Sequence, residues 1–415
     1  MQLNQIDIND FNYFLPEEKI AQYPLENRDE SKLLFYNAND NSIKHYFFYD
    51  LPNLLPENSL LVRNVSKVFP ARFFLTKITG GKVEILLENP VSYSLPQIAL
   101  AKSSPQIWQC TMRGKNLKPG VILSTEFNSN SPVQQDFFIK GEIVEDIEGK
   151  RNVNFSWEPA NLSFAEFLSE IGKVPLPPYI HRTPEEIDKI KYQTVFAKYD
   201  GSIAAPTAGL HFTEKIDSAI INLGIQIEEI VLHVGSGTFQ PLKTDFVAEH
   251  NMHFEQFQIS LDFLVKLRDS LQAKKKIIAT GTTTVRTLET LFWLGNKFNL
   301  SKIEPNETII LKQWDWLELI SQKLLSPADS IQILINLLSE NSSNQIIGQT
   351  QLFIVPGYDF KIVDGIITNF HLPKSTLLLL VAAFVGKDNY KNIYKIALEK
   401  NYRFLSYGDS SFLLK

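Results

Sequence analysis

The sequence predicts an α/β fold: a mostly parallel sheet with flanking helices, interrupted by a small inserted β-barrel domain. From Gly201 to the C-terminus, predicted strands and helices alternate, which is typical of parallel strands joined by crossover helices. Between about 71 and 155 the apolar runs become short and alternating, with Gly and Pro turns, which predicts antiparallel strands closing into a barrel. The 415 residues suffice for this division into 1–70 plus 156–415 and 71–155.

Elements before position 201 follow from local signals. Residues 33–36 and 60–62 are apolar runs that predict buried strands. The capping box at Thr183 to Glu186 has Pro in its first turn and predicts a helix from there to about Lys198. Arg28 is either half of a surface ion pair or a fixed guanidinium for a carboxylate or phosphate, and the residues alone favour the ion pair.

The second half of the chain repeats one strand–loop–helix pattern. Thr213 can cap a helix that ends before Gly224. Apolar periodicity predicts further elements: strands at 227–232, 276–279 and 362–367, and helices at 285–294 and 376–385. The segment 296–350 is partly helical and polar near 340–344, so it is predicted to be a surface insertion without an assigned function.

Composition bounds the class of protein. Cys110 is the only cysteine, which excludes internal disulfides and thiolate metal sites and fits a reducing cytoplasm. The N-terminus has no signal-peptide pattern, and the apolar run 377–385 is far shorter than the roughly 20 residues that span a bilayer. With a net charge of −5, any nucleic-acid contact must come from a local basic patch.

Small, hydroxyl-bearing loops follow the predicted strands, and several of them carry a histidine. Because loops at the carboxyl ends of parallel strands converge, His211, His233 and His371 are expected to share one site with Thr207 and the nearby loop hydroxyls. Glycines at 235 and 237 let the backbone approach a ligand closely. The run 281–284 at a helix start is a candidate anion site, but neither loop matches a phosphate-binding loop or a dinucleotide fingerprint.

The run HNMHFE at 250–255 suggests either a metal site or an acid–base pair. On a strand only His253 and Glu255 share a face, which leaves one ligand too few for a usual zinc site. A histidine oriented by a carboxylate and used as acid or base is the better interpretation, and no metal is expected.

Two charged features near the C-terminus also favour a ligand. Lys374 stands at a helix start, where a cation opposes the helix dipole, so a bound anion would explain it. The tail 402–409 interleaves aromatic residues with Arg403 and Asp409. It is either a docked C-terminal strand or a base-stacking wall.

A set of short motifs covers nearly the whole chain in order: LP (15–16), IAQ (20–22), RD (28–29), PAR (70–72), PLPPY (175–179), APTAGLHFT (205–213), LHVGSGTF (232–239), HNMHFE (250–255), GTTTVR (281–286), PGY (356–358), TNFHLPKST (368–376) and YRFLSYGD (402–409). With these motifs the chain resembles the S-adenosylmethionine:tRNA ribosyltransferase-isomerase family of queuosine biosynthesis. The resemblance implies an α/β catalytic domain interrupted by a small β-barrel.

It also implies a reaction on tRNA carrying 7-aminomethyl-7-deazaguanine at the wobble position of a GUN anticodon. The ribosyl part of S-adenosylmethionine would be transferred to the aminomethyl group and isomerised, giving epoxyqueuosine in tRNA with release of adenine and methionine. S-adenosylmethionine would be a consumed substrate and no cofactor would be needed. A cytoplasmic monomer without membrane contact is expected.

This chemistry needs a base near neutral pH for the proton beside the sulfonium, and histidine suits that task. The catalytic candidates are His211, His233, His253, Glu255 and His371, with Glu255 or Asp409 orienting one imidazole. The substrate-binding candidates are Thr207, Gly209, Gly235, Gly237, Thr238, Gly281, Thr282, Thr283, Arg286, Asn369, Lys374, Ser375, Arg403, Tyr407, Asp409 and Arg28.

Some positions depart from the family pattern. Where the family tends to have Asn-Asp-Thr-Arg, this chain has Asn64-Val-Ser-Lys67, so the acid and the arginine are lost. Phe412 replaces the usual methionine, and the segment 296–350 is longer than usual. Two alternative functions therefore stay open: a non-catalytic RNA-binding homologue, and an S-adenosylmethionine-using enzyme that acts on a free small molecule.

Overall fold

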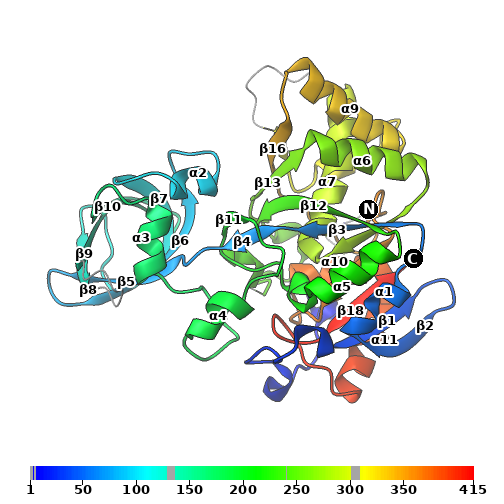
Figure 1. Cartoon of the computed structure of the whole chain (residues 1–415), viewed down its shortest axis with the longest axis horizontal. Helices are drawn as coiled ribbons and strands as arrows, with labels where there is room; N and C mark the ends of the chain where they lie inside the picture. The colour runs from blue at the N-terminus through cyan, green and yellow to red at the C-terminus, as the bar shows by residue number, and fades with distance from the viewer. Residues whose placement is uncertain (1–2, 4–5, 129–135, 240, 301–308) are drawn as a thin grey trace.

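A large α/β body carries a smaller barrel on one side (Figure 1). The computed structural model describes residues 3, 6–128, 136–239, 241–300 and 309–415. The predicted α/β fold with an inserted β-barrel is confirmed. The chain leaves the body after β4 (Ser66–Val68) and returns along β11 (Tyr199–Ser202), and these two strands pair in parallel at the junction.

The large body is built on a sheet that has ten strands within the described residues. In sheet order these are β15 (Ile309–Leu311), β16 (Gln345–Thr350), β13 (Glu255–Ser260), β12 (Gln226–His233), β3 (Ser59–Asn64), β14 (Lys276–Thr280), β17 (Gly365–Asn369), β18 (Ser410–Leu414), β1 (Lys32–Asn37) and β2 (Ser42–Phe47). The pairs β12–β3, β3–β14 and β14–β17 are all parallel. Antiparallel pairings on both sides make the whole sheet mixed.

Strand β3 is buried along its entire length, as expected for a strand covered on both faces. Leu60 and Val62 pack into one core cluster and Leu61 into another, because successive side chains point to opposite faces. The first cluster includes side chains from the longer helices: α6 (Leu261–Gln272), α7 (Thr282–Leu300), α9 (Pro327–Glu340), α10 (Thr376–Val385) and α11 (Lys387–Glu399). The opposite face is covered by α1 (Leu51–Leu54) and α5 (Glu214–Asn222).

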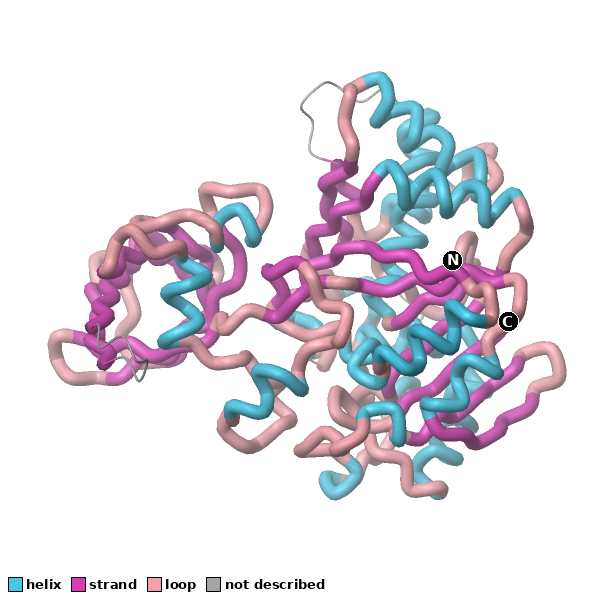
Figure 2. Tube along the Cα trace, in the orientation of Figure 1, coloured by secondary structure: helices cyan, strands magenta, loops and turns pink. Residues whose placement is uncertain are grey.

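The barrel is closed by six strands in the part of the chain described here. They are β10 (Lys150–Glu158), β7 (Gln106–Arg113), β6 (Lys82–Pro90), β5 (Arg72–Lys77), β8 (Ile122–Asn128) and β9 (Asp136–Ile147). Figure 2 shows helix α3 (Phe164–Ile171) lying against this ring of strands. Its Phe164 stacks on Trp157 with ring centroids 4.7 Å apart, so α3 completes the barrel's core.

The remaining elements are short. They comprise α2 (Pro96–Leu100), α4 (Glu186–Lys191), α8 (Asp315–Leu319) and the 3-10 helices η2 (Ile8–Phe11), η3 (Glu17–Lys19), η4 (Arg28–Glu30), η5 (Phe48–Asp50), η6 (Thr207–His211), η7 (Ser236–Phe239) and η8 (Val247–Glu249). The helix predicted from Thr183 to Lys198 is wrong in length, because only α4 forms. The Asp188 carboxylate accepts the backbone N–H of Glu185 and thereby sets a later start.

The segment 296–350 supplies both sheet strands and helices. It contains β15, β16, α8 and α9, while its residues 301–308 lie outside the described residues. Ile331 and Leu334 of α9 are fully buried in the main core cluster. Part of this segment is therefore core structure, and α9 fixes the position of α7.

Replacing Gly295 by Ala should lower the free energy of unfolding by about 1–3 kcal/mol, measured by urea denaturation. A Cβ at Gly295 in α7 would lie 2.1 Å from the backbone oxygen of Ser330 in α9. This clash outweighs the gain in helix propensity of about 1 kcal/mol. Gly81→Ala is the control, since its Cβ meets only the Lys77 side chain at 3.7 Å. Equal stability of both variants and wild type would contradict the packing argument.

Candidate active site

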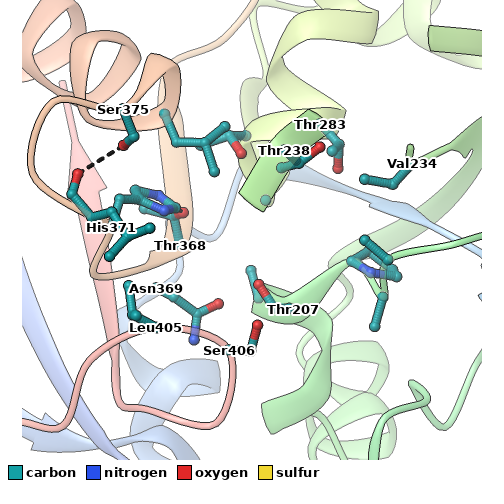
Figure 3. A pocket seen from close by; sticks show the side chains of 18 of the residues that line it. Thr207, Val234, Thr238, Thr283, Thr368, Asn369, His371, Ser375, Leu405 and Ser406 are labelled. Atoms are coloured by element: carbon teal, nitrogen blue, oxygen red, sulfur yellow. Dashed lines mark hydrogen bonds between the residues drawn. The ribbon is translucent and has the colours of Figure 1, made fainter. Parts of the chain in front are cut away.

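A pocket opens at the carboxyl ends of β12, β14 and β17. We call it the central pocket. It is lined by Tyr179, 204–208, Val234, Thr238, 281–283, 368–372, Ser375, Leu377, Leu405 and Ser406, and it encloses about 640 Å³ when its open mouth is counted. In Figure 3, Thr238 and Thr283 lie across the pocket from Thr368 and His371. Loops that are far apart in sequence thus meet where an α/β sheet places its ligand.

Local chain geometry explains two of the pocket's walls. Gly281 adopts a φ of +89°, which favours glycine and turns the chain from β14 directly into α7. The amides of the first helical turn have no intrahelical acceptor, so α7 begins with donors beside the pocket. Ser375 caps α10 by accepting the N–H of Leu378 at 3.2 Å, and this fixes the loop that follows β17.

His371 is the histidine of the central pocket. Its Nε2 lies 2.9 Å from the Thr368 hydroxyl, and its backbone N–H donates to the Tyr394 hydroxyl at 3.1 Å. The Tyr13 hydroxyl donates to its carbonyl oxygen. Burial lowers the pKa of His371 from 6.5 to about 3, because the imidazolium is poorly solvated. The imidazole is therefore neutral at physiological pH and rigidly placed.

His211 lies behind the pocket wall. Its Nε2 is 3.1 Å from the Asn369 side-chain nitrogen and its Nδ1 is 2.8 Å from the Ser31 hydroxyl. Burial, and then the charge of Arg403, lower the pKa of His211 to about 3. If the Asn369 amide donates, Nε2 is the acceptor and Nδ1 carries the proton. This contact leaves the Asn369 carbonyl oxygen buried without a partner among the described residues.

A second pocket continues past Ser406, which lines both. We call it the basic pocket; it is lined by Pro24, Leu25, Arg28, Ser31, Lys191, Leu210, His211, Arg403, Ser406, Tyr407 and Gly408. The Arg28 guanidinium donates to the carbonyl oxygens of Gln193 and Ile190 at 2.6 and 2.9 Å. Arg28 is thus a cation held in place by main-chain carbonyl groups. The structure does not show the surface ion pair that the residues alone favoured.

A third pocket, the interdomain pocket, adjoins the central pocket through Thr238, Thr283 and Leu377. The barrel contributes Glu88, Asn89, Thr111 and Lys150, and the main body contributes Ile203, His233, 235–238, Pro241, Lys243, Thr244, 249–256, Thr283, Arg286, Thr376 and Leu377. His233 places its Nε2 3.2 Å from the Gln258 side-chain nitrogen. Burial lowers the pKa of His233 to about 4, so it too is neutral.

Glycine is required where the loops pass these histidines. A Cβ at Gly237 would come within 2.3 Å of the His253 ring, and one at Gly201 within 2.7 Å of the His233 ring. The glycines therefore place the backbone directly against the imidazoles.

Neither predicted carboxylate orients a histidine. Glu255 instead forms an ion pair with Arg286, whose Nε donates to the Leu352 carbonyl at 3.1 Å. Both side chains are buried, so each charge requires the other. Asp409 accepts the backbone N–H groups of Lys32 and Arg403 and pairs with the Arg403 guanidinium at 3.3 Å. The prediction that Glu255 or Asp409 orients an imidazole is therefore wrong.

The structure distributes the remaining predicted residues unevenly. Thr207, Gly281, Thr282, Asn369 and Ser375 line the central pocket, Gly235 lines the interdomain pocket, and Arg403 and Tyr407 line the basic pocket. Three candidates lie outside these pockets in the described structure. Lys374 donates to the Asn9 side chain at 2.6 Å, Gly209 packs against Phe196 and Thr194, and Asp409 braces Arg403. Lys374 also has a φ of +53°, so the loop's shape sets its position.

Glu88 is a residue of the site that the sequence analysis did not identify. This barrel carboxylate is buried and accepts a hydrogen bond from the Thr111 hydroxyl of the barrel at 2.7 Å. It also accepts one from the Ser236 hydroxyl of the main body at 2.8 Å, which links the two bodies. Strand alternation would point position 88 away from the buried set Val83, Ile85 and Leu87. An irregularity in the β6–β7 register between Leu87 and Asn89 turns it inward, and no sequence signal marks that bulge.

Among the described residues there is no group of three His, Cys, Asp or Glu side chains that could hold a metal ion. None of the helices in the described ranges is both long and apolar enough to cross a membrane.

Parallel strands at the centre of an α/β body, an inserted barrel and joined pockets define an α/β protein with a candidate ligand site between two bodies. The chain belongs to the family of queuosine biosynthesis proteins, whose family model matches residues 8–413. This confirms the resemblance drawn from its motifs.

Its relatives share nearly its whole length. It is 38% identical to the S-adenosylmethionine:tRNA ribosyltransferase-isomerase of Natranaerobius thermophilus over 98% of this chain and 99% of the relative. Proteins of the same name from Thermosipho africanus and Legionella pneumophila are 37% identical, with the same coverage. A solved structure of S-adenosylmethionine tRNA ribosyltransferase from Thermotoga maritima is 28% identical and covers 98% of this chain and 100% of that chain, with a TM-score of 0.45.

The departure at Asn64 to Lys67 lies beside the site. Val65 is buried in the core cluster of the face covered by α5, and Lys67 pairs with Asp200 at 3.4 Å. Asn64 bonds the backbone of Leu232 in β12 through both side-chain atoms. Among the described residues that line the pockets, none comes from this segment, so the lost acid removes no pocket wall.

The free energy of unfolding should fall as the pH drops from about 6.5 towards 5. The pKa values of His211, His233 and His371 are near 3, 4 and 3 in the folded state, below the ordinary 6.5. In this window the unfolded chain binds protons that the folded chain does not, and each imidazole contributes a slope of about 1 kcal/mol per pH unit. Urea unfolding at several pH values measures the slope.

His371→Gln should reduce this slope by about 1 kcal/mol per pH unit, because one buried imidazole is removed. His181→Gln is the matched control, since His181 is exposed. Identical slopes for wild type and His371→Gln would show that His371 is protonated when folded.

Proposed function

We propose that this protein transfers and isomerises the ribosyl moiety of S-adenosylmethionine onto 7-aminomethyl-7-deazaguanine at the wobble position of tRNA with a GUN anticodon. The products are epoxyqueuosine in tRNA, adenine and methionine. Family membership along residues 8–413 supports this reaction. The observation that carries it is the direct connection of the central and interdomain pockets through Thr238 and Thr283, because the reaction must hold two substrates in contact.

S-adenosylmethionine occupies the central pocket in this proposal. The first-turn amides of α7 suit the methionine carboxylate, since a helix N-terminus favours negative charge. Asn369, with its unpartnered carbonyl oxygen, and the hydroxyls of Thr207 and Ser406 suit the polar edges of the ribose and adenine. His211 positions Asn369 from behind and has no direct contact with this substrate.

Histidines that line the central and interdomain pockets serve as proton carriers. The sulfonium makes the neighbouring ribose carbon acidic, and a neutral imidazole can accept that proton. His371 lines the central pocket and is the first choice for this step. Its pKa near 3 lies below the near-neutral value that the sequence-based argument expected of this base. The imidazolium that forms therefore passes its proton on readily, and the leaving adenine is a suitable acceptor. His233 and His253 line the interdomain pocket, where the tRNA amine must be neutral to attack.

The modified base occupies the interdomain pocket. Phe254 lines it with an aromatic side chain 49% exposed, which a base taken out of the anticodon stack can contact. In the wall of the interdomain pocket, the charges of Glu255 and Arg286 neutralise each other. We further propose that the protein acts as a cytoplasmic monomer, that S-adenosylmethionine is consumed as a substrate, and that no cofactor takes part.

The decisive test is product analysis. tRNA carrying 7-aminomethyl-7-deazaguanine is incubated with the protein and S-adenosylmethionine, and the digested nucleosides are identified by mass spectrometry. Epoxyqueuosine together with released adenine is expected. Adenine release with the free base alone would point to a small-molecule enzyme, and salt-sensitive tRNA binding without adenine release would point to a non-catalytic RNA-binding protein.

Substituting His371 by Ala should slow single-turnover adenine release by about 100-fold or more, as expected for loss of an acid–base group. His233→Ala and His253→Ala are tested in the same assay, and His211→Ala should mainly raise the KM for S-adenosylmethionine by releasing Asn369. His45→Ala is the control, because His45 contacts Tyr402 and lines none of the described pockets. Near-normal rates in all four variants would refute the acid–base role.

A further inference from the structure

A groove outside the three pockets separates the barrel from the segment 175–183. We call it the outer groove. It encloses about 1140 Å³ including its open mouth, with one wall from barrel strands β5, β6 and β7 and the other from this segment. Thr111, Ile203 and Ser236 line both the outer groove and the interdomain pocket, so the groove leads directly to the proposed base site.

The outer groove is basic although the whole chain is acidic. Arg72, Arg113 and Arg182 line it together with one carboxylate, Glu84, whereas the chain as a whole carries a net charge of −5. Glu84 pairs with Arg72 at 2.7 Å. Arg113 is exposed and forms no ion pair within 4.0 Å among the described residues, although Glu84 stands opposite it in the β6–β7 register. A local excess of guanidinium groups attracts phosphate.

The two walls differ in how the charge of their arginine side chain is paired. Arg182 is held by Asp188 through two contacts of 2.7 Å and lies 4.1 Å from the centroid of the Tyr23 ring. Its charge is compensated, so it shapes the wall. Arg113 lies at the end of β7 on the opposite wall. Its cross-strand neighbour Glu84 is paired with Arg72, so these three side chains together keep one excess positive charge. Arg113 is therefore the residue whose removal should change anion binding most.

We propose that the outer groove holds the sugar–phosphate backbone of tRNA next to the nucleotide that enters the interdomain pocket, with Arg113 contacting a phosphate. This inference rests on the proposed function. A nucleotide inserted between the two bodies must carry its neighbouring phosphates along, and the shared lining at Ser236 and Thr111 makes the groove the adjoining path. Phosphate contacts position the strand without reading its sequence.

The test measures tRNA affinity as a function of NaCl concentration, using an unmodified transcript with a GUN anticodon and no S-adenosylmethionine. Arg113→Gln should weaken binding several-fold at low salt and reduce the slope of log K against log salt by about 0.7–0.9, the value for one lost phosphate contact. Arg113→Lys should retain most of the slope, because it keeps the charge.

Lys118→Gln is the matched control: it removes one positive charge from an exposed barrel position outside the groove. Circular dichroism melts confirm folding of each variant. An Arg113→Gln slope equal to wild type, or an equal loss in Lys118→Gln, overturns the inference. With modified tRNA, Arg113→Gln should raise the KM for tRNA and leave that for S-adenosylmethionine unchanged. If wild type makes no epoxyqueuosine but the slopes differ as stated, the proposed reaction fails and the groove assignment stands.

Discussion

The parallel pairing of β12, β3, β14 and β17 is the constraint on which the site depends. Parallel strands bring their carboxyl ends to one edge, so the loops that follow β12, β14 and β17 must meet there. Strand β3 makes this possible by burying Leu60, Leu61 and Val62 on its two faces. Packing of the core therefore fixes the place where the loops of the central pocket meet.

Burial of the imidazoles has a chemical consequence. A histidine in water is partly protonated near neutral pH, whereas burial holds His211, His233 and His371 neutral. Neutral rings do not repel a sulfonium, and an imidazole with so low a pKa releases readily any proton that it accepts. The same burial lowers stability in acid, so the arrangement links the chemistry of the site to the pH range in which the fold persists.

The elements whose local signals agree with their packing were predictable from sequence. Helix α10 has the predicted bounds of 376–385, and Thr213 caps α5 through the N–H of Ile216. The site was less predictable, because its contacts join residues far apart. Nothing local shows that Glu255 pairs with Arg286, or that a bulge turns Glu88 inward. The helix predicted from Thr183 starts later because Asp188, which also accepts the Tyr407 hydroxyl, accepts the Glu185 N–H and makes Glu185 the cap.

The barrel contributes residues to the walls of the interdomain pocket. Glu88 joins it to the Ser236 loop, and Lys150 lies against the same carboxylate at 3.2 Å. This buried carboxylate accepts two hydroxyls and one ammonium, so it resists separation of the two bodies, since opening them would leave its charge less well compensated. The loop between β12 and η7 is thus supported from the main body by the sheet and from outside by the barrel. Residues of both bodies line the pocket there, so the barrel helps to define it although its described part contains no histidine.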